Sequence, residues 1–402
     1  MKPAKRYRSL LAVNAGSSSI RFSVFEAGAP MRRLLEGKVE RIGLPGTGLT
    51  YSDARGGRVG HVRIPAGSVP VFLADWLGTQ PTFASVGAIG HRVVHGMRRT
   101  LPARVTPGLL RELRRTSPFD PDHLPREIEL IQAFRESHPR IPQVACFDTA
   151  FHRSMPRVAR MLAIPRRFEA MGVVRYGFHG LSYEYLMEEL RRTAGPAQAR
   201  GRVILAHLGN GASLAAVWRG RSVDTSMGFT PAAGLVMSTR SGDLDPGIPG
   251  FLARRAGMSA SGFQSMANKE SGLLGISGTS SDMRDLLARR GRDARAAEAV
   301  ELFCYQAAKW IGAYAAVLGG LDGLVFSGGI GENAPEVRAR ICSRLGFLGV
   351  RLDARRNRAG APLISAAAGA VAVRVIRTDE ELMIARSVAR VTGLGAQRKY
   401  HS

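Results

Sequence analysis

The sequence predicts an α/β protein that contains two copies of one domain. Apolar runs of strand length alternate with helix-like segments along the chain, which is the pattern of sheets covered by helices. The segment at 11–25 (LAVNAGSSSIRFSVF) resembles the segment at 205–218 (LAHLGNGASLAAVW). Each joins two apolar runs through a turn rich in Gly, Asn or Ser, which indicates a β-hairpin. With 402 residues, the chain is long enough for each hairpin to open one domain.

The first hairpin turn carries groups that can bind phosphate. Ser17, Ser18 and Ser19 offer hydroxyl hydrogen bonds, and Arg21 follows with a positive charge. The alternative is a polar turn at the protein surface. If both hairpin turns face one ligand, that ligand lies in a cleft between the two domains.

In the first half of the chain, loops and short strands are expected over 36–70. After them, polar side chains lie at the ends of two expected strands. The segment GHRVVHG at 90–96 places Arg92 at a strand end, where it can grip a carboxylate or phosphate, or form a structural ion pair. Helices are expected over 109–116 and 126–136. A strand over 142–147 then ends at Asp148, which is placed either to engage Mg²⁺ or to cap the helical run that follows.

The second half begins with a loop of aromatic residues and histidine. RYGFHG at 175–180 places His179 at the start of an amphipathic helix over 182–192, where its ring can meet an anion or serve a structural role. The second hairpin turn, 209–211, can aim backbone N–H groups at one point and form an anion nest, although an ordinary turn fits equally well. A Gly- and Ser-rich segment with Arg240, Asp243 and Asp245 follows.

The last third indicates a nucleotide-binding arrangement. A helix begins at Asp282, and a long buried helix is expected over 296–319. A strand over 323–326 enters the glycine loop SGGIGEN at 327–333, which leads into another helix and so offers N–H groups to phosphate or ribose. The final strand ends at TDEE, 378–381, whose carboxylates suit a metal or a helix cap.

Composition indicates a cytoplasmic globular protein without a membrane segment. Apolar residues make up 45% and charged residues 22%, no apolar run reaches membrane-spanning length, and the N-terminal run stops at Asn14. The three cysteines are far apart and lack a CxxC pair, so buried thiols are expected.

The charge balance is the unusual feature of the composition. With 57 basic and 32 acidic residues, the net charge is +25, which raises nucleic-acid binding as a rival function. The excess is mostly arginine, spread in pairs over helix-like segments without a recognisable nucleic-acid-binding signature, so solvated helix faces are favoured. The P-loop, protein-kinase and nucleophile-elbow signatures are also absent, so phosphate contacts are expected from the glycine hairpins.

Taken jointly, ten motifs resemble those of the acetate kinase family, in order and over essentially the whole chain. They are NAGSSSIRF, GHRVVHG, FDTAFH, RYGFHG, HLGNGAS, DTSMGFTP, TRSGDLDPG, KESGLLGISGTSSDMRD, FSGGIGEN and TDEELMIAR. The resemblance implies two duplicated ribonuclease H-like (βββαβαβα) domains, as in the superfamily of acetate and sugar kinases, Hsp70 and actin, with the nucleotide in the cleft between them. It implies a first domain over 1–150 plus 386–402 and a nucleotide-binding and dimerisation domain over 151–385.

The implied reaction is reversible, Mg²⁺-dependent, in-line phosphoryl transfer from ATP to acetate, giving acetyl phosphate and ADP, by a cytoplasmic homodimer. Mn²⁺ is expected to substitute for Mg²⁺. A kinase for propionate or another short-chain carboxylate is the nearest alternative. A catalytically weakened, basic nucleic-acid-binding relative is the remote one.

The resemblance also implies a role for each matching residue. The catalytic residues are Arg92, Asp148, His179, Asn210 and Arg240, and the acceptor-binding residues are Arg92, Val94, Phe178 and Pro231. The nucleotide-binding residues are Asn14, Ser17, Ser19, Arg21, His207, Gly209, Asn210, Gly211, Asp282, Arg284, Gly329, Gly331 and Asn333. Asn14, Asp148 and Glu380 are the residues expected to engage the metal.

Some positions depart from the family pattern. Arg21 stands where the family has lysine, and SPFDP stands where it has PLHNP, so Phe119 replaces a histidine beside the acyl pocket. Tyr183 replaces another histidine, and Gly96-Met97 replaces a pair of glycines. These changes leave the preference between acetate and propionate open.

Overall fold

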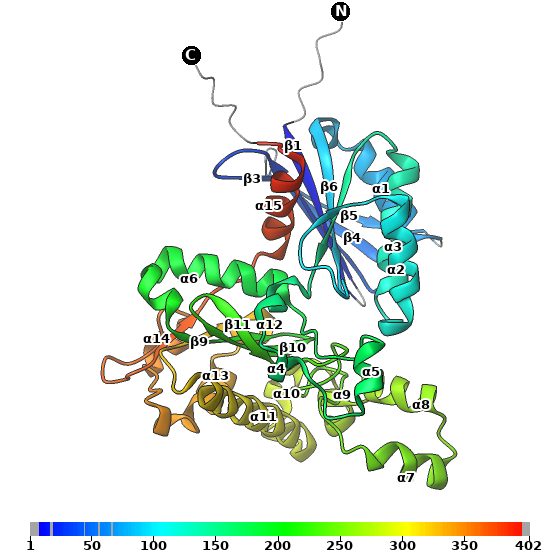
Figure 1. Cartoon of the computed structure of the whole chain (residues 1–402). Helices are drawn as coiled ribbons and strands as arrows, with labels where there is room; N and C mark the ends of the chain where they lie inside the picture. Colours follow the sequence, from blue (N-terminus) through cyan, green and yellow to red (C-terminus); the bar gives the residue numbers. More distant parts are fainter. Residues whose placement is uncertain (1–7, 17–18, 44, 55–56, 66, 396–402) are drawn as a thin grey trace, which may run out of the picture. The chain divides into compact units, whose positions relative to one another are not determined.

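The computed structural model describes residues 8–16, 19–43, 45–54, 57–65 and 67–395. The chain divides into two compact units, which are described separately. Unit 1 comprises Met1–Ala150 with Asp379–Ser402, and unit 2 comprises Phe151–Thr378. Each unit contains a β-sheet with helices packed against it (Figure 1), so the predicted α/β class is confirmed.

In the described part of unit 1, the sheet has eight strands in the order β5-β4-β3-β2-β1-β6-β8-β7. They are β1 (Ser9–Ala15), β2 (Ile20–Glu26), β3 (Arg32–Glu40), β4 (Gly48–Asp53), β5 (Arg58–Arg63), β6 (Val86–Val93), β7 (Ala103–Arg104) and β8 (Gln143–Phe147). Strands β1 and β2 form the predicted hairpin, with Asn14 opposite Arg21. Strand β6 runs parallel to both β1 and β8, so these three strands end at the same edge of the sheet.

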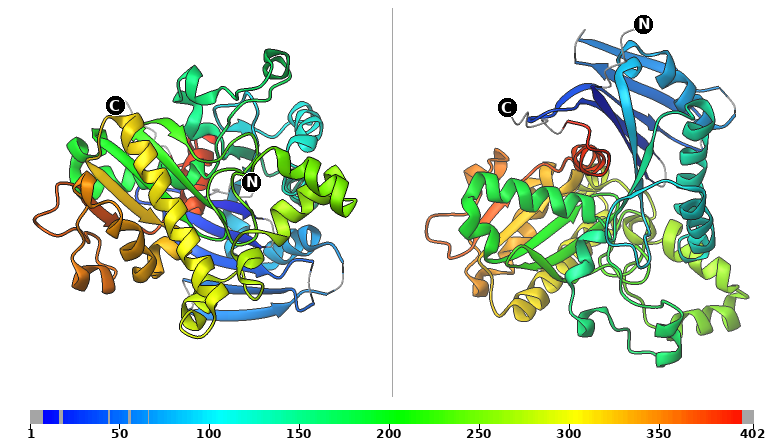
Figure 2. Two further views of the ribbon diagram at one scale, coloured as in Figure 1. Left: turned by 90° about the horizontal axis from the view of Figure 1, so that it is seen from below. Right: turned by 45° about the horizontal axis from the view of Figure 1, so that its top comes forward.

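Helices cover both faces of this sheet. The right-hand view of Figure 2 shows α15 (Glu380–Thr392) on one face and α1 (Val69–Thr79) and α3 (Leu124–Ser137) on the other. Helix α2 (Pro107–Thr116) lies beside α3 and is followed by the short turn η2 (Ser117–Phe119), while η1 (Pro81–Ser85) precedes β6. Helix α15 packs so closely on β6 that a Cβ atom at Gly90 would lie 2.4 Å from Val388 and 2.5 Å from Ile384.

Unit 2 repeats the order of five of the eight strands of unit 1, β3-β2-β1-β6-β8. In its described sheet, the order is β11-β10-β9-β12-β13. The strands are β9 (Arg202–Leu208), β10 (Ala212–Trp218), β11 (Arg221–Thr225), β12 (Gly323–Ser327) and β13 (Ala372–Val375). The hairpin β9–β10 is antiparallel, and β12 runs parallel to both β9 and β13, as β6 does with β1 and β8. The similarity of the two hairpins therefore extends through both sheets.

The sheet of unit 2 lies between two long helices, α6 (Gly180–Arg200) and α11 (Ala294–Leu318), one on each face (Figure 1). The other helical segments are η3 (Ala150–Ser154), α4 (Arg157–Arg160), α5 (Arg166–Ala170), α7 (Gly247–Ala256), α8 (Ala260–Ser265), η4 (Met266–Glu270), α9 (Gly272–Ser277), α10 (Met283–Arg289), α12 (Gly328–Asn333), α13 (Pro335–Ser343), η5 (Gly346–Leu348) and α14 (Ala354–Arg358). The segment expected to be a glycine loop at 327–333 is thus the short helix α12.

The chain returns to unit 1 at Asp379, whereas the family resemblance implies a return at 386. Asp379 caps α15 by accepting the Leu382 N–H at 3.0 Å, and the helix packs along its length on β1, β2 and β6. A boundary inside the helix would divide one packed element between two units. All three cysteines are buried, as expected. None of the helices that the structure describes is long and apolar enough to cross a membrane.

Candidate active site

A buried ion pair lies where β6 and β8 end in unit 1. Arg92, near the end of β6, donates from Nη2 to Asp148 Oδ2 at 2.7 Å and from Nη1 to the Ala15 carbonyl at 2.9 Å. Asp148, the residue after β8, has no exposed surface, and its own N–H donates to the Val93 carbonyl. Parallel strands bring their carboxyl ends together, which explains why these residues meet.

Two acidic residues at the start of α15 join this cluster. Asn14, on β1, donates from Nδ2 to Glu380 at 2.8 Å and to Glu381 at 2.9 Å. Burial raises the pKa of Glu380, Arg92 opposes that rise, and the charge of Asp148 adds to it. The acids of this edge therefore outnumber its buried arginine, an arrangement that favours a further cation.

Arg92 is the positive centre of the cluster. Burial alone would lower its pKa, but the charge of Asp148 raises it most among the neighbouring groups, so the guanidinium stays charged. Its Nε is buried and has no hydrogen-bond partner among the described residues. Since a buried N–H without a partner is costly, this atom is suited to an oxygen of a ligand.

A second group of residues meets at the hairpin turn of unit 2. A Cβ atom at Gly211 would lie 3.2 Å from His179 Nε2 and 3.5 Å from Arg240 Nη1. The His179 ring also stacks on the His207 ring, with centroids 4.2 Å apart. An imidazole N–H and a guanidinium therefore converge on the turn that was expected to contact phosphate.

The orientation of His179 is fixed by its backbone and its neighbours. It precedes α6 with a left-handed backbone (φ 60°), and its Nδ1 lies 2.8 Å from Ser213 Oγ, which is also bonded to the Tyr183 hydroxyl. When Nδ1 accepts from Ser213, Nε2 carries the proton and faces Gly211. His152 holds the same loop from behind, because its Nε2 bonds the Phe178 carbonyl at 3.0 Å.

Arg240 is held by a tightly packed loop. Its Nη1 donates to the Pro231 carbonyl at 3.1 Å, and the preceding backbone is bonded to α9, where the Leu273 N–H donates to Met237. Gly272 has a φ of 63°, and a Cβ atom there would lie 2.2 Å from the Met237 carbonyl oxygen. Only glycine allows this approach of α9 to the loop. Asn210 is tied to the same loop, because its carbonyl accepts the Ser238 N–H.

Helix α12 places its glycines near the hairpin turn. A Cβ atom at Gly209 would lie 3.8 Å from the Gly329 nitrogen, and Asn333 donates to the Gly329 carbonyl at 2.9 Å. The fully buried Arg338 donates to the carbonyls of Gly331 and Glu332 at 2.8 and 2.9 Å. A buried guanidinium therefore holds the carbonyl end of a six-residue helix.

The residues expected in the site fall into two groups, one in each unit. In unit 1, the group consists of Asn14, Arg92, Asp148 and Glu380, and Ser19, Arg21 and Val94 lie on the same strands or at their ends. In unit 2, the group consists of Phe178, His179, His207, Gly209, Asn210, Gly211, Pro231 and Arg240, together with Gly329, Gly331 and Asn333 on α12. Asp282 and Arg284 form an ion pair of 2.6 Å at the start of α10, with Arg284 well exposed. Ser17 lies outside the described residues.

The second hairpin turn differs in detail from the expected nest. Neither Gly209 nor Gly211 is among the described residues with positive φ. At Gly211, the reason for glycine is instead the close approach of two side chains. Asp243 and Asp245 shape their own loops by accepting backbone N–H groups of Gly234 and Gly247.

The sequence reasoning missed buried polar residues that support the site. Glu127 on α3 and Arg338 on α13 are examples. Glu127 had a visible signal, because it occupies a core-facing position between Leu124 and Ile131 in the helix pattern. Arg338 had none, since its partner Asn357 is remote in the sequence and an arginine in a helix is ordinary.

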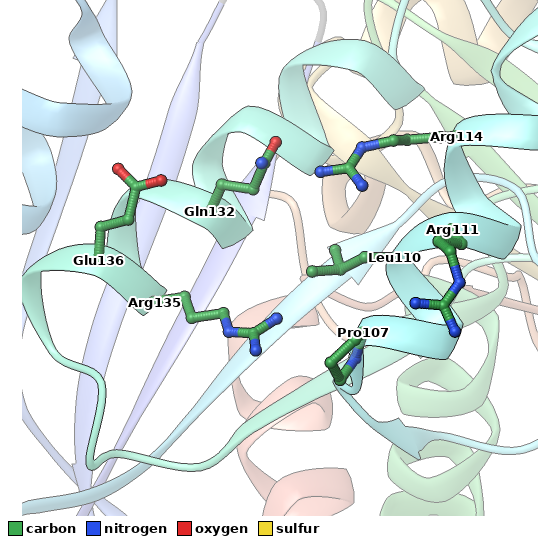
Figure 3. A pocket seen from close by; sticks show the side chains of 7 residues that line it. All are labelled: Pro107, Leu110, Arg111, Arg114, Gln132, Arg135 and Glu136. Atoms are coloured by element: carbon green, nitrogen blue, oxygen red, sulfur yellow. The ribbon is translucent and has the colours of Figure 1, made fainter.

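A hollow of about 460 Å³ is lined by residues of α2 and α3 and contains none of the expected site residues. It is lined by Pro107, Leu110, Arg111, Arg114, Gln132, Arg135 and Glu136. Figure 3 shows Arg114 and Arg135 extending toward this hollow from opposite sides.

A five-strand order shared by two sheets, an arginine with carboxylates at strand ends, and a His and an Arg that converge on a glycine turn fit the class of phosphotransferases, which the family match identifies. Residues 9–386 match the model of the acetokinase family. The chain belongs to that family.

Individual relatives agree with this assignment. The chain is 45% identical over 397 residues to the acetate kinase of Rhodopseudomonas palustris, covering 96% of this chain and 99% of that protein. It is 42% identical over 391 residues to the propionate kinase of Citrobacter rodentium, covering 95% and 96%. The crystal structure of Porphyromonas gingivalis acetate kinase is similar with a TM-score of 0.86 and 35% identity, covering 96% of this chain and all of that one.

Proposed function

We propose that this chain transfers the γ-phosphoryl group of ATP to acetate, in a reversible reaction that gives acetyl phosphate and ADP. The observation that carries the proposal is the convergence of His179 Nε2 and Arg240 Nη1 on Gly211 in the second hairpin turn. Phosphoryl transfer needs positioned positive charge and hydrogen-bond donors more than covalent help from the protein. The family membership supports the same reaction.

The chemistry requires no general base. Acetate is ionised at neutral pH, so a carboxylate oxygen attacks the γ-phosphorus directly. The bond between that phosphorus and the β–γ bridging oxygen breaks, and ADP leaves with the bonding electron pair. The developing charge on the phosphoryl oxygens is stabilised by donors that are already in place.

Arg92 and Arg240 are the proposed contacts of the acceptor carboxylate and the transferring phosphoryl group. Asp148 and the Ala15 carbonyl hold the Arg92 guanidinium while leaving Nε without a protein partner in the described structure. Arg240 is anchored by Pro231. His179 and Asn210 are proposed to contact the phosphoryl group in the transition state, with Val94, Phe178 and Pro231 beside the acyl methyl.

The metal in the proposal is Mg²⁺, held through Asn14, Asp148 and Glu380. Their oxygen donors suit this hard cation, and the buried, mutually repelling acids gain from its charge. No group of three His, Cys, Asp or Glu in the described chain could hold a metal by itself. That fits an ion that takes one or two carboxylates from the protein and other ligands from phosphates and water. When bound, it would neutralise and orient the phosphate oxygens.

The nucleotide contacts extend this proposal over both hairpins. Asn14, Ser17, Ser19 and Arg21 are proposed for the phosphates on the unit 1 side. On the unit 2 side, the contacts are His207, Gly209, Asn210, Gly211, Asp282, Arg284, Gly329, Gly331 and Asn333. The homodimer, the domain roles and the cytoplasmic location stay predictions.

A propionate kinase is the second candidate. The observation that favours it lies at the altered SPFDP segment, where the Phe119 ring lies 6.2 Å from the His95 ring, just beyond Val94. A phenyl ring in place of the expected imidazole changes the size and polarity of this region. The propionate kinase relative supports the same alternative.

The test is acyl phosphate formation from ATP and Mg²⁺, trapped as the hydroxamate, with acetate, propionate, butyrate and glycerol as acceptors. We expect turnover with acetate that falls at least about 100-fold in Arg240→Ala, because one charge contact in the transition state is lost. Arg254→Ala, an exposed arginine on α7, is the control and should keep full activity. Preference for propionate would select the second candidate, and product from no acid would refute both.

A further inference from the structure

Helix α3 buries an acidic residue in an apolar layer. Glu127 is only 2% exposed and lies on the same buried face as Leu124, Ile128 and Ile131. These apolar residues belong to the cluster that packs against Val93 at the end of β6. Burying a carboxyl group among apolar residues costs free energy unless its oxygen atoms form hydrogen bonds with the protein or with a ligand.

One oxygen of Glu127 holds the backbone just beyond β6. Its Oε2 accepts the Val94 N–H at 2.9 Å, in a fully buried contact. Val94 is the first residue after the strand, and Arg92 lies two residues before it. The following Gly96 packs against Phe147, where a Cβ atom would lie 2.8 Å from the ring. Glu127 therefore fixes the strand end between the buried arginine and a tightly packed turn.

The second oxygen of Glu127 is not used by the protein. Glu127 Oε1 and Asp120 Oδ2 are both buried and have no hydrogen-bond partner among the described residues. Asp120 precedes α3, and its Oδ1 lies 2.8 Å from His123 Nδ1. The charged groups that face Glu127 are Arg92 from β6, Asp148 after β8 and Asp120.

We propose that Glu127 is a positioning residue for the acceptor carboxylate, acting through the Val94 backbone and through the charge of Arg92. This inference rests on the proposed function, because the acceptor site it adjusts is the one that Arg92 and Val94 would form. Glu127 contacts no substrate. It sets the position of the strand end and the net charge around the guanidinium.

The protonation state of Glu127 provides a readout of this role. Burial raises its pKa to about 8, Arg92 and the Val94 N–H oppose the rise, and Asp120 and Asp148 add to it. At pH 7 the carboxyl group is therefore mostly neutral. Above pH 8 it becomes negative and competes with the acceptor for Arg92, which should raise the KM for acetate.

The experiment compares Glu127→Gln, Glu127→Leu and the wild-type chain in steady-state kinetics. The amide oxygen of Gln can still accept the Val94 N–H, so its KM for acetate at pH 7 should stay within about threefold of wild type. Leu removes the acceptor, and we expect the KM for acetate to rise at least about tenfold while the KM for ATP stays nearly constant. Glu129→Leu, on the exposed side of the same helix, is the matched control.

The pH profile keeps the test decisive if the Leu variant does not fold. The wild-type KM for acetate should rise above about pH 8, and Glu127→Gln should show no such rise. Identical profiles for these two proteins would overturn the inference, as would a folded Leu variant with an unchanged KM for acetate. An inactive wild-type chain would instead refute the proposed function, so the two failures are distinguishable.

Discussion

His179 is the side chain whose surroundings are most specific to the proposed chemistry. Ser213 fixes its Nδ1, the His207 ring lies against its face, and its Nε2 points at the glycine turn. His152 has a structural role in the same loop, because its two ring nitrogens lie 2.9 and 3.0 Å from Ser222 Oγ and the Phe178 carbonyl oxygen.

Replacing His179 should therefore affect the reaction more than the fold. We expect His179→Ala to lower kcat by about 100-fold or more, because a donor to the transferring group is lost. Steady-state acyl phosphate formation measures this, with thermal unfolding to check that the variant is folded. His61, an exposed strand residue, gives the control substitution His61→Ala. Equal activity of both variants would remove His179 from the proposed site.

Glu127 should also affect stability, with a definite sign. Its pKa is raised from an ordinary value of 4.5 to about 8, so the folded chain holds this proton more tightly than the unfolded chain. The tighter binding of this proton contributes at most about 5 kcal/mol to the free energy of unfolding. This contribution is fully present below pH 4.5 and is lost as the pH rises to about 8. Glu127→Gln should remove this loss.

Chemical denaturation of wild type and Glu127→Gln at several pH values between 5 and 8 measures the effect. We expect the difference between their free energies of unfolding to change in favour of the Gln variant as the pH rises. Glu129→Gln should run parallel to wild type. A constant difference between Glu127→Gln and wild type across this range would mean that Glu127 is already ionised in the folded chain.

At the scale of elements, α15 is the part that connects the fold of unit 1 to its chemistry. The helix carries Glu380 in its first turn and packs on β6, which carries Arg92. The contact depends on Gly90, because a side chain there would meet Val388 and Ile384 at 2.4 and 2.5 Å. Helix α15 and strand β6 must approach closely so that Glu380 and Arg92 lie at the same edge of the sheet.

Gly90→Ala should therefore separate α15 from the sheet. We expect the free energy of unfolding to fall by about 1 to 3 kcal/mol, as in other overpacked cores. Acyl phosphate formation should fall as well, because Glu380 moves with the helix. The matched control is Gly323→Ala in β12, where the nearest atom to the new Cβ would lie at 3.6 Å. Equal stability of the two variants would contradict the packing argument.

The elements that sequence patterns predicted best are those with strong local signals. Both hairpins and the long helix α11 follow from apolar periodicity and turn residues. Helix α12 was expected as a loop because its glycines disfavour a helix locally, whereas the buried Arg338 on the following helix stabilises it by donating to its carbonyl groups. Arg92 and Asp148 could be placed at strand ends, but their bond depends on the pairing of β6 with β8, which local patterns do not reveal.

At the scale of the whole molecule, the structure accounts for the duplication of the domain but not for the net charge. The five-strand order that both sheets share accounts for the two hairpin turns and for the two groups of site residues. Some arginines form surface ion pairs, such as Arg157 with Glu169 and Arg192 with Glu189, both at 2.6 Å. Such pairs do not change the net charge of +25, and its interpretation as solvated helix faces stays a prediction.

The central claim is that one chain joins ATP and acetate into an acyl phosphate. Phosphorus NMR of the purified chain with ATP, Mg²⁺ and acetate tests it directly, because acetyl phosphate, ADP and inorganic phosphate give separate signals. We expect acetyl phosphate and ADP to appear in equal amounts, and the reaction to reverse when ADP and acetyl phosphate are supplied. ADP accompanied only by inorganic phosphate, or unchanged ATP with correctly folded protein, would contradict the claim.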